Sequence, residues 1–394
     1  MRRIDLKKAN VARPNTIRDI NRQIVLNYVR ERGPISRAEI AQETALQRST
    51  VSLIVEELKA GGLIEEVSGE STGGRPPILL SLRASDAVAI GVDLSTIRTI
   101  VATSDLAGRV IEQEEFPTDP DARKSISRVI ESARRLLSKN GGTIEGIGVS
   151  LPGLVDQETG TAIFIPHFKW RDLEIVEEIR SAVGLAVTAD NDANAAALAE
   201  LWFGRPEIRG LRDFIMVLVE EGVGTGIVFD GQVYRGKSGA AGEFSHMTIG
   251  QDAPVACAAG SHRCWEAFAS ERAALARYAR SKPDGGKINF GQLVGLAFDG
   301  ECEAKRALKE TAYYLGLGIA NLIQGLSPEA VIVGGPIVRA WPLIACDVRT
   351  AVQESICRGV PPAHIIASTL GAEPTLMGAL SLVLTAKFTP VSLT

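Results

Sequence analysis

The spacing of the apolar residues changes near residue 87, and this change limits the possible folds more than any other feature of the sequence. Before that point, apolar side chains recur every three or four residues, which is typical of amphipathic helices. After it, short apolar runs alternate with helical stretches, as expected for sheets covered by helices. We therefore predict a helical domain over residues 1–83 and an α/β domain with two lobes over residues 84–394.

The composition favours a globular protein without a membrane segment or a disulfide framework. Of the 394 residues, 45% are hydrophobic and 23% are charged, which is ordinary for a globular chain. No apolar run approaches the ~18 residues that a membrane span needs, and the basic start leads into polar sequence rather than a signal peptide. The five cysteines form an odd and scattered set, which suits a reducing cytosol. We therefore expect a cytoplasmic protein that does not contact a membrane.

The first unit predicts three helices followed by a β-hairpin. One helix covers residues 17–32, and Ser36 and Glu39 form a capping box that begins a second, short helix. After a tight turn, a third helix begins near Arg48. The apolar stripe of this third helix, which we expect to be buried, consists of Val51, Ile54, Val55 and Leu58. A hairpin follows over residues 63–82.

This order of elements is that of a winged helix-turn-helix, which places the start of its last helix in the major groove of DNA. Charge supports a polyanionic partner, because residues 1–83 carry a net charge of +4 and the rest of the chain −8. The alternative, a three-helix protein-interaction module, explains the helix packing but not the wing or the basic charge. The expected DNA contacts are Gln47, Arg48, Ser49, Thr50 and Ser52 on the third helix and Arg75 in the wing.

The second unit predicts mixed sheets alternating with helices, in two lobes that enclose a cleft. Long helices are expected near residues 121–138 and 303–325. Strands are expected at residues 87–93, 99–103, 110–116, 144–150, 186–190, 213–219, 226–229 and 330–333, the last being the final strand.

Six short motifs follow one another in this unit. They are Leu151–Asp156, Asp190–Glu200, Gly222–Ile227, Gly242–His246, Cys257–Glu266 and Val333–Gly335. Any one of them is weak evidence, but the ordered set is specific. On these motifs the chain resembles the ROK family (repressors, open reading frames and kinases), in its branch of xylose and N-acetylglucosamine repressors with an N-terminal winged helix. The resemblance covers about residues 17–385 and implies an actin-like, ribonuclease-H-type sugar-kinase fold.

The resemblance also implies a sugar-binding site in the cleft. Carboxylates, amides and imidazoles are the groups with which proteins bind the hydroxyls of a sugar. In kinases of the family, the aspartate that matches Asp192 is the base that accepts the proton of the sugar hydroxyl. The alternative is that Asp192 only caps the helix that follows it. The expected effector contacts are Asn191, Asp192, Glu243, His246, Glu266 and His167. His167 and Ser245 depart from the family pattern, so the sugar is not identified.

The phosphate-binding part of the family pattern is broken. Family kinases have two glycines and a threonine after the first strand, where this chain has Ser95-Thr96-Ile97. Without those glycines the backbone cannot wrap closely around a phosphate. A second glycine-rich loop at Gly222–Gly226 is retained, as is Gly334-Gly335. We therefore expect neither ATP binding nor kinase activity, and Asp192 is assigned no catalytic role.

A metal motif is also incomplete. Family members hold a structural zinc ion with a cysteine-rich motif and an upstream histidine, a tetrahedral set. This chain keeps His246, Cys257 and Cys264, but Ala259 stands where a further cysteine is expected. His262 is a candidate substitute, although it does not occupy the lost position. One structural zinc ion per chain and a zinc-free loop with two ordinary thiols are both open.

Together these features predict a DNA-binding repressor of carbohydrate uptake or catabolism genes, controlled by a sugar or sugar phosphate in the kinase-like cleft. Because one winged helix buries little DNA surface, specific binding needs two half-sites. We therefore expect a homodimer or higher oligomer on a palindromic operator. The alternatives are an ATP-dependent sugar kinase with a regulatory DNA-binding head, and a repressor that responds to a protein partner.

Overall fold

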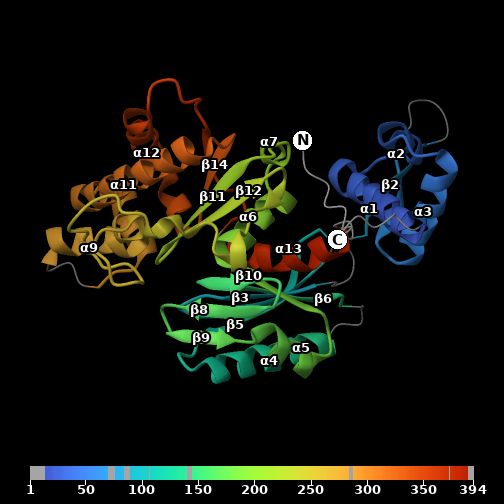
Figure 1. Cartoon of the computed structure of the whole chain (residues 1–394), viewed down its shortest axis with the longest axis horizontal. Coiled ribbons are helices and arrows are strands. Elements are labelled where there is room, and N and C mark those ends of the chain that lie inside the picture. Colours follow the sequence, from blue (N-terminus) through green and yellow to red (C-terminus); the bar gives the residue numbers. More distant parts are fainter. Residues whose placement is uncertain are drawn as a thin grey trace.

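The computed structural model describes residues 14–69, 76–83, 89–105, 107–139, 144–283, 287–371 and 373–388. A small helical head lies beside a larger body of two lobes, each built on a five-stranded sheet (Figure 1). The predicted α/β class, with a winged helix-turn-helix ahead of a two-lobed body, is confirmed. The boundary predicted between residues 83 and 84 stays a prediction, because residues 84–88 lie outside the described part of the chain.

The head has the three helices and the hairpin that the apolar periodicity predicts. Its elements are α1 (Pro14–Arg32), α2 (Arg37–Thr44), α3 (Arg48–Ala60), β1 (Ile64–Ser68) and β2 (Ile78–Leu82). The capping box forms: the Ser36 hydroxyl accepts from the Glu39 N–H at 3.2 Å, and the Glu39 carboxylate accepts from the Ser36 N–H at 2.9 Å. The apolar stripe of α3 is buried as predicted, and it packs into one core with the other two helices.

The first lobe is built on a sheet with the strand order β10-β6-β3-β4-β5. Its strands are β3 (Ala89–Leu94), β4 (Arg98–Ser104), β5 (Val110–Pro117), β6 (Gly146–Leu151) and β10 (Val187–Asn191). Helices α4 (Ala122–Lys139) and α5 (Ile175–Val183) cover one face, and α13 (Pro374–Phe388) lies along the other (Figure 1). Because β3 and β6 are buried on both faces, their residues form nearly continuous apolar runs.

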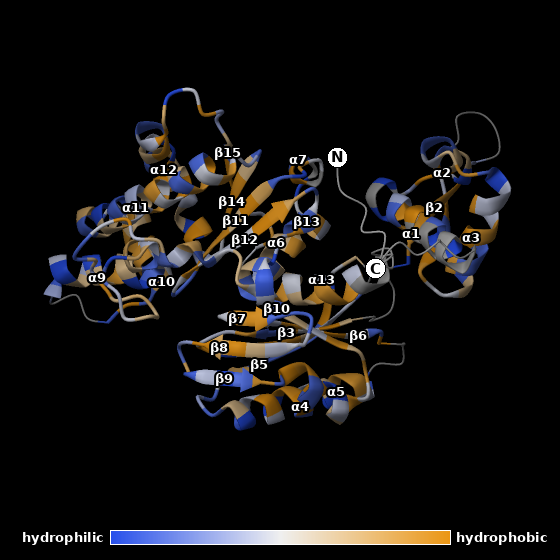
Figure 2. Ribbon diagram, viewed as in Figure 1, coloured by the Kyte–Doolittle hydropathy of each residue, from blue (hydrophilic) through white to orange (hydrophobic). Residues whose placement is uncertain are grey.

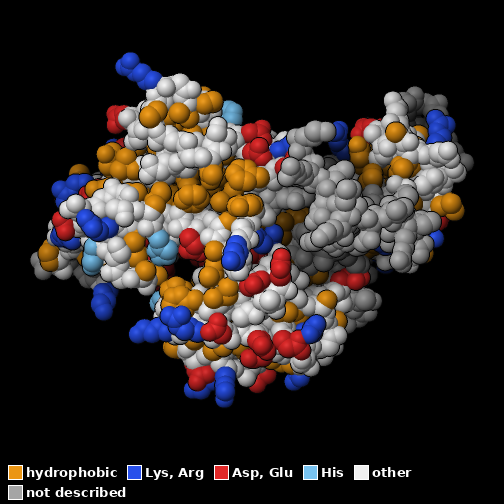
Figure 3. Space-filling model, in the orientation of Figure 1, with side chains coloured by type: hydrophobic (Ala, Val, Ile, Leu, Met, Phe, Trp, Pro, Cys, Tyr) orange, Lys and Arg blue, Asp and Glu red, His pale blue; other side chains and the backbone are white. Residues whose placement is uncertain are grey.

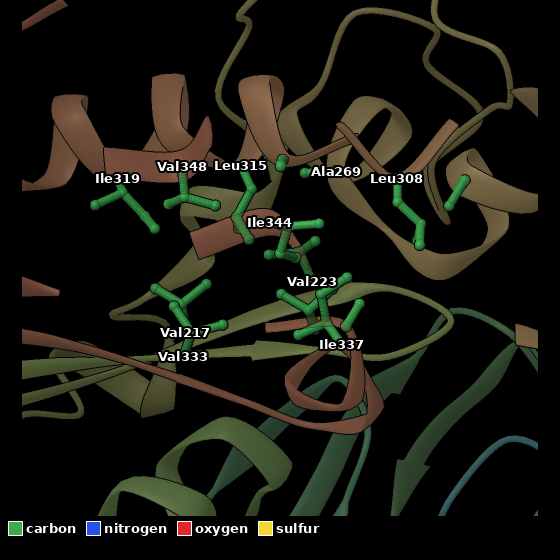
Figure 4. Packing of buried hydrophobic residues seen from close by; sticks show 14 of the residues in the cluster. Val217, Val223, Ala269, Leu308, Leu315, Ile319, Val333, Ile337, Ile344 and Val348 are labelled. Carbon is green, nitrogen blue, oxygen red and sulfur yellow. The ribbon is translucent and has the colours of Figure 1, made fainter. Parts of the chain in front are cut away.

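The second lobe is built on a sheet with the strand order β13-β12-β11-β14-β15. Its strands are β11 (Phe214–Val219), β12 (Val223–Phe229), β13 (Gln232–Val233), β14 (Ala330–Gly334) and β15 (His364–Ala367). Its helices are α8 (Trp265–Ala269), α9 (Glu271–Ser281), α10 (Phe290–Phe298), α11 (Cys302–Leu326) and α12 (Trp341–Ser355). Val217 and Val333 of the sheet face Leu315 and Ile319 of α11 and Val348 of α12, which form the core of this lobe (Figure 4).

Helix α6 (Asp192–Phe203), followed by the short α7 (Pro206–Arg209), lies between the two sheets. On one side, Ala193 and Ala197 pack against β11, and on the other α6 packs against α13. Gly378 of α13 makes this close contact possible, since a Cβ atom there would lie 2.2 Å from the backbone of Ala195. The starting point of α6 is therefore fixed by contacts with both lobes.

Two predictions about strands are wrong. The strand at residues 330–333 is not the last, because the four-residue β15 follows it and pairs with it in parallel. That strand is too short and too exposed for its apolar residues to show a period. The strand expected at residues 226–229 begins earlier, at Val223, so most of the glycine-rich segment Gly222–Gly226 is strand rather than a phosphate loop. Gly226 is needed there for packing, since a Cβ atom would lie 2.3 Å from the Ala193 carbonyl oxygen.

A small sheet that the sequence did not predict completes the first lobe. It consists of β7 (Leu154–Asp156), β8 (Thr161–Ile165) and β9 (Trp170–Leu173), joined as an antiparallel meander. Figure 2 shows apolar strands inside both lobes and polar outer surfaces on the helices that cover them. Among the described residues, no helix combines the length and the apolar character that crossing a membrane requires.

The head contacts the body at the end of α6 that lies away from its first residue. Trp202 of α6 and Leu382 and Leu384 of α13 belong to the same apolar core as the head helices. The guanidinium of Arg30, in α1, lies over the Trp202 ring at 4.1 Å from its centroid, which is a cation–π contact. Trp202 Nε1 donates to Thr385 Oγ1 at 2.9 Å, which fixes the indole against α13.

Candidate functional site

A cavity of about 440 Å³ lies between the two lobes, in the size range of small-molecule sites. The first lobe contributes the β3–β4 and β8–β9 turns and the start of α6, and the second contributes the β11–β12 turn and the 3₁₀ turn Glu243–His246. On the face visible in Figure 3, acidic and histidine side chains gather where the two lobes meet. The walls of the cavity therefore belong to both lobes, and they combine acidic and histidine side chains with apolar ones.

The six residues assigned to sugar binding all line this cavity. They are Asn191, Asp192, Glu243, His246, Glu266 and His167. Asn191 and Asp192 stand where β10 meets α6, His167 stands on the β8–β9 turn, and the others come from the second lobe. The fold thus brings together side chains that lie about a hundred residues apart, while their binding of a sugar stays a prediction.

Asn191, rather than Asp192, caps α6. The Asn191 Oδ1 atom accepts from Ala193 N at 2.9 Å and from Asn194 N at 3.2 Å, and its Nδ2 donates to the Gly153 carbonyl at 2.9 Å. The polar atoms of Asn191 therefore already have partners inside the protein. Asp192 Oδ1 also accepts from Ala193 N, at 2.7 Å, and its carboxyl group borders the cavity. Asp192 is thus not needed as the cap and is available to a ligand.

Three carboxyl groups of the cavity hold their protons unusually tightly. Burial raises the pKa of Asp93 to about 7, and the charge of Glu373 adds to the effect. Burial, together with the charges of Asp93 and Glu243, raises the pKa of Asp192 to about 7. The pKa of Glu220 is raised well above its ordinary value by burial and by the like charges of Asp93 and Asp192. Such carboxyl groups can both donate to and accept from hydroxyl groups near neutral pH.

Two turns meet across the cleft beside these carboxyl groups. Residues 95–97 connect β3 to β4 in the first lobe, and residues 220–222 connect β11 to β12 in the second. The Thr96 hydroxyl donates to Glu221 Oε2 at 2.5 Å, which joins the two lobes. Thr96, Glu220 and Glu221 all line the cavity, so acidic side chains stand beside the turn that lacks the family's glycines.

A second group of polar residues consists of Glu243, His246 and Glu266. His246 Nε2 lies 3.8 Å from Glu243 Oε2. Glu266 Oε1 accepts from the Ala258 N–H at 2.8 Å and from Arg272 Nη2 at 3.2 Å. Because Glu266 is only 6% exposed, the guanidinium of Arg272 compensates a charge that would otherwise be buried without a partner.

His246, Cys257 and Cys264 form a candidate metal site beside the cavity. Their ligand atoms lie within 4.8 Å of one another, and the Cys264 thiol donates to Cys257 Sγ at 3.0 Å. The set has one ligand fewer than a closed tetrahedral zinc site, so zinc binding stays a prediction. His262 is not in this group, and its Nδ1 lies 3.2 Å from the Ala253 carbonyl oxygen. Its role as a substitute ligand stays a prediction.

The start of α3 presents the polar residues expected to contact DNA. Gln47, Arg48, Ser49, Thr50 and Ser52 are all at least partly exposed. Arg75, the predicted wing contact, lies outside the described residues. Leu53, which the sequence analysis missed, is 68% exposed on the same helix. An exposed apolar side chain on a helix that enters the major groove suits the methyl group of thymine.

The acidic residues of the β11–β12 turn were also missed. A signal was available, because Glu220 and Glu221 directly follow an apolar strand and precede a glycine-rich segment. No local signal pointed to Arg272, which reaches the cavity from α9 only because that helix packs beside α8. Residues of this second kind can be identified only from the fold.

Comparisons with known proteins agree with this organisation. A profile of the ROK family matches residues 89–386, and a profile of the winged helix-turn-helix DNA-binding type matches residues 18–65. The chain is 33% identical over 335 residues to the xylose repressor of Caldicellulosiruptor bescii, covering 81% of this chain and 83% of the repressor.

Solved structures with similar folds include a regulator and a kinase. One is a ROK family transcriptional regulator, a homologue of the Escherichia coli MLC protein, with a TM-score of 0.79 and 26% identity, covering 95% of this chain and 97% of the regulator. The other is a ROK family glucokinase from Streptomyces griseus in complex with glucose and AMPPNP, with a TM-score of 0.69 and 29% identity, covering 75% of this chain and 98% of the kinase. The regulator thus matches nearly the whole chain, and the kinase three quarters of it.

Proposed function

This chain belongs to the ROK family, and on that basis we propose that it is a transcriptional repressor whose binding to operator DNA is controlled by a sugar. One observation carries the proposal. The same chain contains a helix-turn-helix whose third helix starts with exposed polar residues, and a cavity lined by carboxylate, amide and imidazole groups of the kind that bind sugars. The match to a xylose repressor supports this combination, since it extends over 81% of the chain. The genes under control would serve carbohydrate uptake or catabolism.

The DNA contacts would come from the first two turns of α3. Arg48 can contact a guanine through two hydrogen bonds, and the neighbouring hydroxyls of Ser49 and Thr50 can bind phosphates or bases. One such helix contacts only a short DNA segment, so specific binding requires two heads on adjacent half-sites. We therefore propose a homodimer or higher oligomer on a palindromic operator.

The sugar would bind between the lobes and fix their relative position. Asp192 reaches it from the first lobe, and Glu243 and His246 reach it from the second. A ligand that contacts both lobes binds best to one distance between them, and it shifts the protein toward that state by its difference in affinity. This is the change that would be transmitted to the head.

Helix α6 offers a direct route for that transmission. It begins with Asp192 at the cavity and, about 15 Å further along its axis, reaches Trp202, which contacts Arg30 of the head. Because α6 is buried along most of its length, it moves as a rigid body. A displacement of its first turn by the sugar would therefore change the position of the head on the body, and with it the spacing of the two heads in a dimer.

Sugar phosphorylation is the second candidate, because the ROK family also includes glucokinases and Asp192 is retained. Two features oppose it. The turn Ser95-Thr96-Ile97 has no glycine that could approach a phosphate closely, and the carboxyl groups of Glu220 and Glu221 stand beside it. We propose that phosphoryl transfer has been lost. An assay of ADP release over a sugar panel separates the two functions, since a kinase would release ADP.

We further propose that His246, Cys257 and Cys264 hold one structural zinc ion. The support is the closeness of their ligand atoms and the burial of both thiols. When bound, the ion would link the turn Glu243–His246 to the loop before α8, and so stabilise the wall that carries Glu243 and Glu266.

The decisive experiment measures sugar binding and operator release in the wild type and in Asp192→Asn. The variant keeps the shape of the side chain but loses a carboxyl oxygen that can accept from a sugar hydroxyl, so it should lose ~1–3 kcal/mol of sugar affinity. Its operator binding without sugar should be unchanged, because Asp192 lies in the body. Asp299→Asn, an exposed carboxylate at the end of α10, serves as control. Release of Asp192→Asn at the wild-type sugar concentration would show that the effector does not bind in this cleft.

A further inference from the structure

We propose that the effector is an uncharged sugar and that the cleft excludes the phosphate ester of the same sugar. This inference rests on the proposed function, because it assumes that the effector binds in the cavity between the lobes. It replaces the open choice between a sugar and a sugar phosphate with one chemical class.

Acidic groups outnumber basic groups along the cavity. Among the described lining residues, Lys169 and Arg272 carry positive charges. Arg272 is already engaged, since its Nη2 donates to Glu266 at 3.2 Å and its Nε donates to the Glu221 carbonyl at 2.9 Å. Lys169 is exposed on the β8–β9 turn, where water screens its charge. Six carboxyl groups line the same cavity: Asp93, Asp192, Glu220, Glu221, Glu243 and Glu266.

The positive charge of Arg98, which acts on Asp93 but does not line the cavity, is also balanced by carboxylates. Arg98 donates to Glu373 Oε1 at 2.6 Å and to Glu115 Oε2 at 3.1 Å, so its charge is balanced by two carboxylates. Glu373 in turn repels Asp93. Burial, with like charges adding to the effect, already raises the pKa values of Asp93 and Glu220, so a further negative charge beside them is unfavourable. A phosphate dianion would add two further like charges in a place that is poorly screened by water.

The start of α6 does not offer a substitute anion site. The first N–H groups of a helix often bind phosphate, but here Ala193 N and Asn194 N already donate to Asn191 Oδ1. Asp192 adds its own carboxyl group at the same helix end, where Ala193 N also donates to it. A phosphate would have to displace these acceptors and then lie against a carboxylate.

The contact between the two turns occupies another place where a phosphate could lie. Thr96 and Glu221 join the lobes at 2.5 Å, next to the cavity. A phosphate group placed there would have to break this hydrogen bond and meet the Glu221 carboxylate. An uncharged sugar avoids these costs, because its hydroxyls can donate to carboxylates and accept from protonated carboxyl groups. Rejection of the charged analogue by like charges is a common source of specificity.

The test compares each free aldose with its own phosphate ester. D-glucose is paired with D-glucose 6-phosphate, and N-acetyl-D-glucosamine with its 6-phosphate, and other aldoses are added in the same way. Calorimetry gives the dissociation constants for the full-length protein, and operator release in a gel shift gives the functional readout. The same pairs are measured with Glu221→Gln, which removes the carboxylate that accepts from Thr96, and with Glu158→Gln, an exposed carboxylate on the β7–β8 turn, as control.

We expect the ester of whichever sugar binds to be at least tenfold weaker than the free sugar, about 1.4 kcal/mol. In Glu221→Gln this ratio should shrink by roughly tenfold, because one of the carboxylates that repel the ester is gone, and in Glu158→Gln it should not change. The ratio isolates the charge from any effect on shape.

Three results would overturn the inference. If an ester binds and releases operator as well as its free sugar, the inference is wrong while sugar control stands. If the discrimination in Glu221→Gln is the same as in the wild type, the carboxyl groups are not its cause. If no free sugar and no ester releases operator, sugar control itself fails, and the inference fails with it.

Discussion

Replacing Asp93 by asparagine should stabilise the unliganded protein, and the gain should grow with pH. Asp93, the second-last residue of β3, borders the cavity, is only 6% exposed, and has a pKa raised to about 7, chiefly by burial. Asparagine has nearly the same shape but cannot ionise. The variant therefore removes the cost of a buried negative charge without opening a cavity in the sheet.

The magnitude follows from the two pKa values. The folded state holds the proton up to about pH 7, whereas the unfolded chain releases it near the ordinary value of 3.8. Between these values the wild type loses about 1.4 kcal/mol of stability for each unit by which the pH rises, and the loss levels off above the folded pKa. From about pH 5.5 to about pH 7.5, the free-energy gap between Asp93→Asn and the wild type should therefore widen by about 2 kcal/mol. For a folding unit of this size, that corresponds to roughly 3 °C in Tm.

The assay is thermal or urea unfolding of both proteins at the two pH values, without sugar. Only the change of the gap with pH matters, because any difference in the hydrogen bond of the amide to Thr375 is the same at both. Asp299→Asn, whose side chain is exposed, controls for a general effect of net charge. A gap that is equal at both pH values would refute the conclusion that Asp93 is a proton-retaining group of the cavity.

The other predictions concern DNA, coupling and metal. Arg48→Ala should weaken operator binding by ~1–3 kcal/mol if Arg48 contacts a base; wild-type affinity in a gel-shift series would contradict the assignment of α3 as the recognition helix. Trp202→Ala should still bind sugar and operator but should require a higher sugar concentration for release, whereas Trp202→Phe, which keeps an aromatic face for Arg30, should be closer to the wild type. Equal release in all three proteins would argue against α6 as the route. Protein prepared without chelator should contain about one zinc per chain, and Cys264→Ser should contain less; metal analysis that finds no zinc in the wild type would favour two free thiols.

Structural features that depend only on residues close together along the chain could be predicted from the sequence. The capping box at Ser36 and Glu39 and the buried stripe of α3 follow from periods of three and four residues. The buried strand that contains Asp93 could also be located, because it is a continuous apolar run of strand length. Ordered motifs identified the family and placed Asp192 at the junction of a strand and a helix, since that junction is itself a local feature.

The tertiary structure alone decided which of these residues meet. Asp93, Asp192 and Glu220 lie in three separate segments, and only the packing of α6 between the two sheets brings their carboxyl groups close enough to alter one another's pKa. The contact of Trp202 with Arg30 likewise depends on where the head rests against α6. Local patterns set which side chains face a core, because helix and strand geometry is periodic along the chain. Electrostatic coupling depends on distance through space, and that distance is fixed only when the two lobes pack.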